Sequence, residues 1–212
     1  MLIRWHIINM FINKKIILVS NSRSRALIFK KNKIKFTQIS PTCDEEKIKK
    51  LEIFKNKKPK DMSLILAIQK VQSVKKRKNN FYYVGADTVV DFNGKQINKA
   101  KTLSEAKKKI KKLSGKKHII YSSAVVIYNN NIVWKKTQKT EVFIRHVSDK
   151  EISLYLKECN KSILGSVGCY QLEENGPSIV ERIKGDFFNV MGFPLFPFLT
   201  FLNEHKNDKI KT

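Results

Sequence analysis

The sequence predicts an α/β protein: a single bilobal domain in which helices flank a twisted, mixed β-sheet. Short apolar runs rich in β-branched residues alternate with segments whose apolar residues recur at the helical period. No repeat or low-complexity linker divides the chain. Its 212 residues, 42% of them hydrophobic, suffice for one well-packed domain but not comfortably for two. We expect the domain to span residues 14–204, between an N-terminal extension (1–13, with Met10 as an alternative start) and a polar tail (205–212).

The first part of the chain predicts two short strands and a long helix. "KKIILVS" is a buried strand, and the polar turn after it leads into the helix start "SRALIFKK". "IKFTQIS" is a second strand, which ends at Pro41. From Asp61 to about Lys78, apolar residues recur close to the helical period until the pattern dissolves in "KKRKNN".

The remaining elements follow from turn and capping signals. "FYYVGADTVVDF" is a half-buried strand, and the Asn93-Gly94 pair after it predicts a hairpin turn. Thr102 and Glu105 fit a capping box for an amphipathic helix, with Gly115 at its C-terminal end. "HIIYSSAVVIY" and "IVWKKTQKTEVFIR" form a long hairpin. Three elements complete the list: a helix from the Ser148/Glu151 capping box to about Glu158, the strand "SIVERI", and a C-terminal helix bracketed by Pro194 and Pro197 that runs to about Asn203.

The charge of the chain has two readings. Lys and Arg total 43 against 18 Asp and Glu, a net charge of +25, which is typical of proteins that bind phosphate backbones. The basic residues are mostly Lys, however, and they accompany abundant Ile and Asn, the set that AT-rich codons favour. The Lys runs are also scattered rather than gathered in one tail. We therefore favour a solvated basic surface over nucleic-acid binding.

Cysteine usage and the N-terminal stretch point to the cytosol. Cys43, Cys159 and Cys169 are odd in number, far apart and without a C-x-x-C pair, so neither a disulfide framework nor a zinc site is indicated. The apolar N-terminal stretch is interrupted by polar residues, lacks a basic n-region and a cleavage site, and is too short to span a bilayer. We expect a reduced cytosolic protein with no membrane partner.

The segment "SNSRSR" is the first candidate for chemistry. The hydroxyls of Ser20 and Ser22, with free backbone N–H groups at a helix start, favour an anion. Arg25, one turn into the helix, adds a donor for charge-assisted hydrogen bonds. The alternative is ordinary N-capping by Ser22.

Acids and lysines supply the other candidates. The acidic loop "PTCDEE" alone reads as solvated, and Lys70 in an apolar helix reads as exposed or snorkelling. Asp87 with Thr88 interrupts an apolar strand, where the alternative is an Asp at a strand end or turn. Together with Lys99 they provide an acid that could hold a metal or activate water, and cations suited to a triphosphate. No P-loop and no G-x-G-x-x-G is present, and His118 and His146 read as structural.

Six segments, in the same order, resemble the Maf family. They are "IILVSNSRSRALIF", "SPTCDEE", "LAIQKV", "VGADTVV", "GKQINKAKTLSEAKKKIKKLSGKKH" and "GSVGCYQLEENGPSIVERIKGDFFNVMGFPL". The likeness runs from about Ile16 to Leu202. It implies a Maf/ITPase-like fold and a cytosolic hydrolase of acid anhydrides, which uses a divalent cation (Mg²⁺ or Mn²⁺) to convert nucleoside triphosphates into monophosphate and pyrophosphate. It also implies a house-cleaning role on non-standard nucleotides and a homodimer.

The resemblance implies a role for each candidate. Asp87 becomes the general base and a metal ligand, and Glu45 a carboxylate that holds metal or positions water. The phosphate-binding group is Ser20, Ser22, Arg25, Lys70 and Lys99. An acid is then tolerated at the end of the sheet because it faces a polar cleft with metal and cations.

Ser24, Thr88 and Glu173 fall at positions that the family uses to select substrates. The usual "S-P-R-R" is altered to Arg23 and Ser24, and the "Q-G" of a later loop is Glu173-Glu174. Thr88 resembles the branch acting on thymidine and uridine triphosphates, whereas Glu173 resembles the branch specific for 7-methyl-GTP, which is the alternative activity. The alternative from another functional class is a basic nucleic-acid-binding module without catalytic activity.

Overall fold

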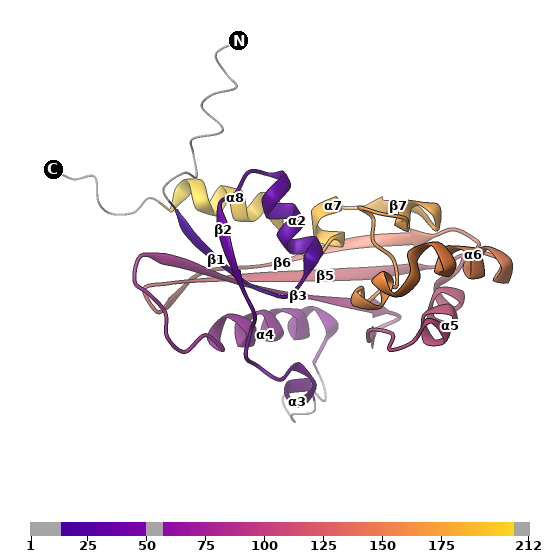
Figure 1. The fold of residues 1–212 in the computed structure, drawn as a ribbon, viewed down its shortest axis with the longest axis horizontal. Helices are drawn as coiled ribbons and strands as arrows, with labels where there is room; N and C mark the ends of the chain where they lie inside the picture. Colours follow the sequence, from indigo (N-terminus) through magenta and orange to yellow (C-terminus); the bar gives the residue numbers. More distant parts are fainter. Residues whose placement is uncertain (1–13, 50–56, 206–212) are drawn as a thin grey trace, which may run out of the picture.

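A computed structural model describes residues 14–49 and 57–205 of the chain. They form the expected α/β fold around one seven-stranded mixed sheet (Figure 1). The expected N-terminal extension and all but the first residue of the polar tail lie outside the described residues. Within the described ranges, no helix combines the length and the apolar character needed to cross a bilayer.

The strands of the sheet lie in the order β2-β1-β3-β5-β6-β7, and a short β4 pairs with β3. β1 is parallel to β2 and β3, whereas every other pair is antiparallel. The strands are β1 (Lys15–Val19), β2 (Phe36–Ile39), β3 (Phe81–Phe92), β4 (Lys95–Ile97), β5 (Lys117–Tyr128), β6 (Asn131–Ile144) and β7 (Val180–Lys184).

The helices divide the molecule into two lobes along the long strands (Figure 1). In the first lobe, α2 (Arg23–Lys31) and α8 (Leu195–Glu204) cover one face of the sheet, and α4 (Pro59–Gln72) covers the other. In the second lobe, α5 (Leu103–Leu113) and α6 (Asp149–Cys159) pack with the far ends of β3, β5 and β6. The shorter elements are α3 (Glu45–Lys49), α7 (Phe187–Val190) and the 3₁₀ segments η2 (Asn160–Gly165) and η3 (Gly176–Ser178).

The predicted turns and caps are confirmed. Asn93 and Gly94 both have positive φ and join β3 to β4 as a two-residue hairpin turn. Thr102 caps α5 by accepting from the Glu105 N–H, although the Glu105 side chain reaches the Lys101 N–H rather than that of Thr102 itself. Ser148 and Glu151 form a complete capping box at α6.

Two expectations need correction. The helix predicted from Asp61 to about Lys78 begins at Pro59 and ends at Gln72, because a C-cap at Ser73 stops it and the chain turns back toward β3. Asp87 was expected at the end of the sheet, or alternatively in a turn. It instead lies within the twelve-residue β3, opposite Ser123 of β5. It is β1 that ends nearby, since the last β1–β3 pair is Val19 with Gly85.

Candidate active site

The site begins where β1 ends beside the longer β3. Ser20 is the first residue after β1, and Asp87 lies two residues beyond the last β1–β3 pair. Side chains at the carboxyl end of a parallel strand in an open α/β sheet commonly line a ligand crevice. Both residues are almost fully enclosed, with exposed fractions of 2% for Ser20 and 6% for Asp87.

Gly85 allows α4 to pack directly on β3 and thereby brings Lys70 to Asp87. A Cβ at Gly85 would lie 2.6 Å from the Ala67 carbonyl oxygen and 2.7 Å from the Val71 Cβ. Lys70 follows on the same helix, and its Nζ lies 2.5 Å from Asp87 Oδ1 and 2.8 Å from Glu45 Oε1. Lys70 is buried, so the reading of an exposed or snorkelling lysine is wrong. A buried cation is tolerated here because two carboxylates pair with it.

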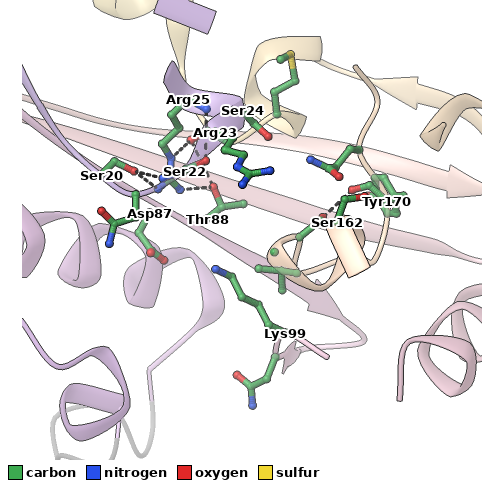
Figure 2. A pocket seen from close by; sticks show the side chains of 18 of the residues that line it. Ser20, Ser22, Arg23, Ser24, Arg25, Asp87, Thr88, Lys99, Ser162 and Tyr170 are labelled. Atoms are coloured by element: carbon green, nitrogen blue, oxygen red, sulfur yellow. Dashed lines mark hydrogen bonds between the residues drawn. The ribbon is translucent and has the colours of Figure 1, made fainter. Parts of the chain in front are cut away.

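Arg25 is also buried, and its guanidinium joins three segments of the chain. Its Nε donates to the Gly192 carbonyl at 2.8 Å, Nη1 donates to Ser20 Oγ at 3.3 Å, and Nη2 donates to Thr88 Oγ1 at 3.0 Å (Figure 2). Burial lowers the pKa of Arg25, and the negative charges of Asp87 and Glu45 oppose that shift.

The N-cap role of Ser22 is confirmed, since its Oγ accepts from the Arg25 N–H.

Lys99 extends toward Asp87 from the segment after β4 (Figure 2). Desolvation lowers its pKa; Arg25 and Lys70 lower it further, whereas Glu45 and Asp87 raise it. The backbone on either side of Lys99 is held in place. Lys109 Nζ of α5 donates to the Asn98 carbonyl, and the Lys101 N–H donates to Glu105 Oε2 at 2.8 Å. Contacts with α5 therefore fix the backbone of the segment from which Lys99 extends into the cleft.

These side chains line one cleft of about 1,210 Å³. Its floor comes from the first lobe, and its far wall comes from residues 159–173 of the second lobe, including Ser162 and Tyr170 (Figure 2). All the site residues predicted from the sequence line this cleft: Ser20, Ser22, Ser24, Arg25, Glu45, Lys70, Asp87, Thr88, Lys99 and Glu173. The structure thus brings the ten candidates together around one cleft.

The three candidate specificity residues differ in how they are held. Thr88 Oγ1 is engaged by Arg25, by Ser122 Oγ at 3.0 Å and by the Gly192 carbonyl. Ser24 is half-buried on the first turn of α2. Glu173 Oε1 is buried on the second-lobe wall and has no hydrogen-bond partner among the described residues, and the same holds for Gln171 Oε1.

The acid pair at the cleft floor suits a hard divalent cation. Glu45 and Asp87 both contact Lys70 Nζ, so their carboxylates converge on one point. Within residues 14–49 and 57–205, no group of three His, Cys, Asp or Glu side chains is arranged as a metal cage. Mg²⁺ does not require one, because it usually binds one or two carboxylates together with substrate phosphates and retained waters. The donor set therefore fits Mg²⁺ bound with its substrate.

Several cleft residues were not singled out from the sequence. Arg23 and Asn21 lie in the "SNSRSR" segment, in which the sequence predicts roles for the serines and for Arg25. Tyr170 is held by His118, whose Nε2 lies 2.6 Å from the phenolic oxygen. Burial lowers the pKa of His118 to about 4, and its exposed fraction is 1%, so the structural role expected for this histidine is confirmed.

Comparison with known proteins agrees with this geometry. The family model described as Maf-like protein matches residues 15–205. A nucleoside triphosphate pyrophosphatase of Caulobacter vibrioides is 32% identical over 89% of this chain and 94% of its own length. A 7-methyl-GTP pyrophosphatase of Bartonella henselae is 34% identical over 87% of this chain and 92% of its own. The corresponding enzyme of Bartonella quintana is 35% identical over the same shares.

Proposed function

Because the chain belongs to the Maf-like protein family, we propose that it is a nucleoside triphosphate pyrophosphatase. In the reaction, water attacks the α-phosphorus, the bond from that phosphorus to the α–β bridging oxygen breaks, and nucleoside monophosphate and pyrophosphate leave. The observation that carries the proposal is the cluster on the floor of the cleft in which the buried Lys70 pairs with the buried Asp87 and with the half-buried Glu45.

The cleft residues supply what phosphoryl transfer requires: a general base, a group that positions water, and cations that neutralise phosphate charge. Asp87 accepts the proton of the attacking water, and Glu45 helps to orient that water or a cation. Lys70 and Lys99 offset the charge of the phosphates, and the hydroxyls of Ser20 and Ser22 lie at the start of α2, where helix amides attract anions. A divalent cation, Mg²⁺ or Mn²⁺, bound by Asp87 and Glu45 would supply further charge neutralisation at the phosphates.

The direct test is metal-dependent release of pyrophosphate from a panel of nucleoside triphosphates. The Asp87→Asn variant should keep its fold, because the side-chain volume is nearly unchanged. Its rate should fall at least about a hundredfold, because an amide cannot replace the carboxylate as general base or metal ligand. Asp91→Asn is a matched control on the same strand, since Asp91 lies in the β3–β4 hairpin, where it accepts from the Gly94 N–H, and does not line the cleft. A folded Asp87→Asn protein with wild-type turnover would refute the assignment.

We propose a preference for guanine-type bases within a broad triphosphate activity, with 7-methyl-GTP as the specific alternative. Support comes from Glu173 and Gln171, which place buried acceptor oxygens without partners, among the described residues, on the second-lobe wall. A carboxylate only accepts hydrogen bonds, so Glu173 suits the N1–H and 2-amino edge of guanine and repels the carbonyl edges of uracil and thymine. The small Ser24 leaves room for a purine.

The base preference is tested with the same panel and the Glu173→Gln variant. We expect the wild type to favour guanosine and 7-methyl-guanosine triphosphates, and the variant to shift toward pyrimidines because an amide both donates and accepts. Wild-type activity on thymidine and uridine triphosphates that equals or exceeds activity on the guanine nucleotides would overturn this preference. Thr88 would then be the better guide to the substrate.

We also propose a cytosolic location. Cys43, Cys159 and Cys169 are all free thiols in the fold, and the latter two are buried. Proteins of oxidising compartments use cysteines mainly in disulfides.

A further inference from the structure

The first turn of α2 carries two arginines in opposite environments. Arg25 is 7% exposed and its three hydrogen bonds go to Ser20, Thr88 and Gly192, which belong to three separate segments of the fold. Arg23 is exposed and is the first residue of the helix, directly after the N-cap Ser22. Both line the cleft, but only Arg23 has a guanidinium that the protein leaves accessible.

Arg23 extends into the cleft between Thr88 and the wall formed by Ser162 and Tyr170 (Figure 2). Among the described residues, none forms an ion pair or a hydrogen bond with its guanidinium. Its position at the start of the helix adds to the effect, because the first amides of a helix have no partner within the helix and the helix dipole favours an anion there. The guanidinium of Arg23 and the N-terminus of α2 therefore both favour an anion in the same region of the cleft.

Two other cations of the cleft, Lys70 and Arg25, already have partners within the protein. Lys70 is paired with Asp87 and Glu45, and the Arg25 guanidinium donates to protein oxygens on three sides. A triphosphate carries several negative charges, so it needs cations that the protein has not already neutralised. Within the described part of the chain, Lys99 and Arg23 both line the cleft without an ion-pair partner. Arginine suits this task because its planar fork can hold two phosphate oxygens at once.

We propose that Arg23 binds the phosphate chain of the substrate, and that Arg25, expected from the sequence to do so, is a positioning residue that fixes Ser20, Thr88 and the Gly192 segment. This inference rests on the proposed function and assigns a binding group within that site.

The test measures binding and not only turnover. Affinity for inorganic pyrophosphate, and for a guanosine triphosphate analogue with an α,β-methylene bridge, is measured by calorimetry at fixed ionic strength. Arg23→Gln should weaken both by about ten- to a hundredfold, the range expected for losing a charge-assisted pair. Arg23→Lys should recover part of this loss, because the charge returns without the fork. Thermal stability should stay near that of the wild type, since the exposed Arg23 guanidinium forms no hydrogen bond or ion pair within the described part of the chain.

Two matched variants complete the experiment. Lys31→Gln removes a charge from the exposed last turn of the same helix and should bind both ligands as the wild type does. Arg25→Gln should lower the melting temperature, because it removes the buried hydrogen bonds that the guanidinium donates to the Gly192 carbonyl and to the Ser20 and Thr88 hydroxyls. An Arg25→Gln variant with wild-type stability would overturn the positioning role.

The outcomes separate this inference from the proposed function. Hydrolysis by the wild type, with unchanged pyrophosphate affinity in Arg23→Gln, refutes the role of Arg23 alone. A loss confined to some bases, with pyrophosphate affinity intact, also refutes it and makes Arg23 a base-reading residue. Arg23-dependent binding of pyrophosphate without any hydrolysis supports the inference and refutes the proposed function. A wild type that neither binds pyrophosphate or the analogue nor hydrolyses any triphosphate refutes both.

Discussion

Lys70 is the residue on which the charge balance of the cleft floor depends. Its ammonium separates two carboxylates that would otherwise repel each other, and one of them, Asp87, is as deeply buried as the lysine itself. Breaking a buried pair by removing one partner is more costly than the pair's net contribution to stability, because an uncompensated charge remains.

Replacing Lys70 with Ala should therefore lower both stability and activity. We expect a loss of about 3 kcal/mol in the free energy of unfolding, together with weaker catalysis that is similar for every nucleotide. Denaturant titration and steady-state kinetics measure the two effects. Lys99→Ala is the control: it should reduce activity equally for all bases while stability stays near wild type, because Lys99 has no ion-pair partner among the described residues. Equal stability of the two variants would contradict the account of Lys70.

His118 makes the free energy of unfolding depend on pH. Burial lowers its pKa from 6.5 to about 4 in the fold, whereas the unfolded chain keeps the ordinary value. Between these two values the unfolded state binds more protons, so stability falls as pH falls from about 6.5 toward 4. The full contribution approaches about 3 kcal/mol, since each pKa unit corresponds to about 1.4 kcal/mol.

His118→Gln should remove that contribution. The stability difference between wild type and variant, measured by denaturant titration from pH 7.5 to pH 4, should shrink or reverse on acidification, since Gln takes up no proton. A difference that stays constant across this range would show that His118 does not titrate as a buried neutral group. Comparing the two proteins cancels the titration of all other residues.

At the scale of elements, the contact between β3 and α4 places the chemistry. Gly85 is the point of closest approach, and a methyl group there would overlap the backbone of α4. Gly85→Ala should push α4 away from the sheet, cost about 1–3 kcal/mol as an overpacked site, and reduce turnover by moving Lys70 from Asp87. Gly165→Ala is the control for the loss of stability, since an added Cβ there meets no atom of the described residues within 4 Å; because Gly165 lines the cleft, it is not the control for turnover. Wild-type activity in Gly85→Ala would mean that the helix position is not critical.

Most elements were predictable because their signals are local. Asn93-Gly94 requires only its own backbone to form the turn, and Ser148 with Glu151 completes its capping box within four residues. The ends of α4 were predicted less well, since the apolar Val74 continues the helical pattern in sequence but packs beside the sheet after the helix has ended. Period alone does not tell a helix residue from one that packs just beyond it.

The candidate site was predictable in membership but not in arrangement. All ten residues named from the sequence reach the cleft, because the motifs that suggested them lie on segments the fold brings together. Whether each side chain is buried and hydrogen-bonded or exposed to the cleft depends on partners distant in sequence. The guanidinium of Arg25 donates to Thr88 and Gly192, which lie 63 and 167 residues away, and no local pattern distinguishes Arg25 from the exposed Arg23.

At the scale of the whole molecule, the two lobes share their strands. Val90, Ile120 and Val142 belong to the second-lobe core, while Val84, Ala124 and Val126 of the same sheet belong to the first. Because β3 and β5 run through both cores without a linker, neither lobe can lose its strands alone. The implied homodimer stays a prediction, to be measured by the mass of the protein in solution.

We expect one cooperative unfolding transition. Calorimetry should give a single peak whose calorimetric and van't Hoff enthalpies agree. Ile152→Ala in the second-lobe core should move the whole peak to lower temperature, as should Phe198→Ala in the first-lobe core, since both side chains are fully buried. Two separated peaks in either variant would show that the lobes unfold independently.

The cleft draws its floor and its far wall from different lobes, and this has a consequence for how such an enzyme can diversify. The groups assigned to hydrolysis, Asp87 and Lys70, are fixed by the first lobe, whereas Glu173 and its neighbours stand on the 159–173 segment of the second. If that segment selects the base, as we propose, substitutions in it change which nucleotide is accepted and leave the groups assigned to hydrolysis in place. New substrates would then be reachable by single mutations, through variants that each keep hydrolytic activity and stay open to selection.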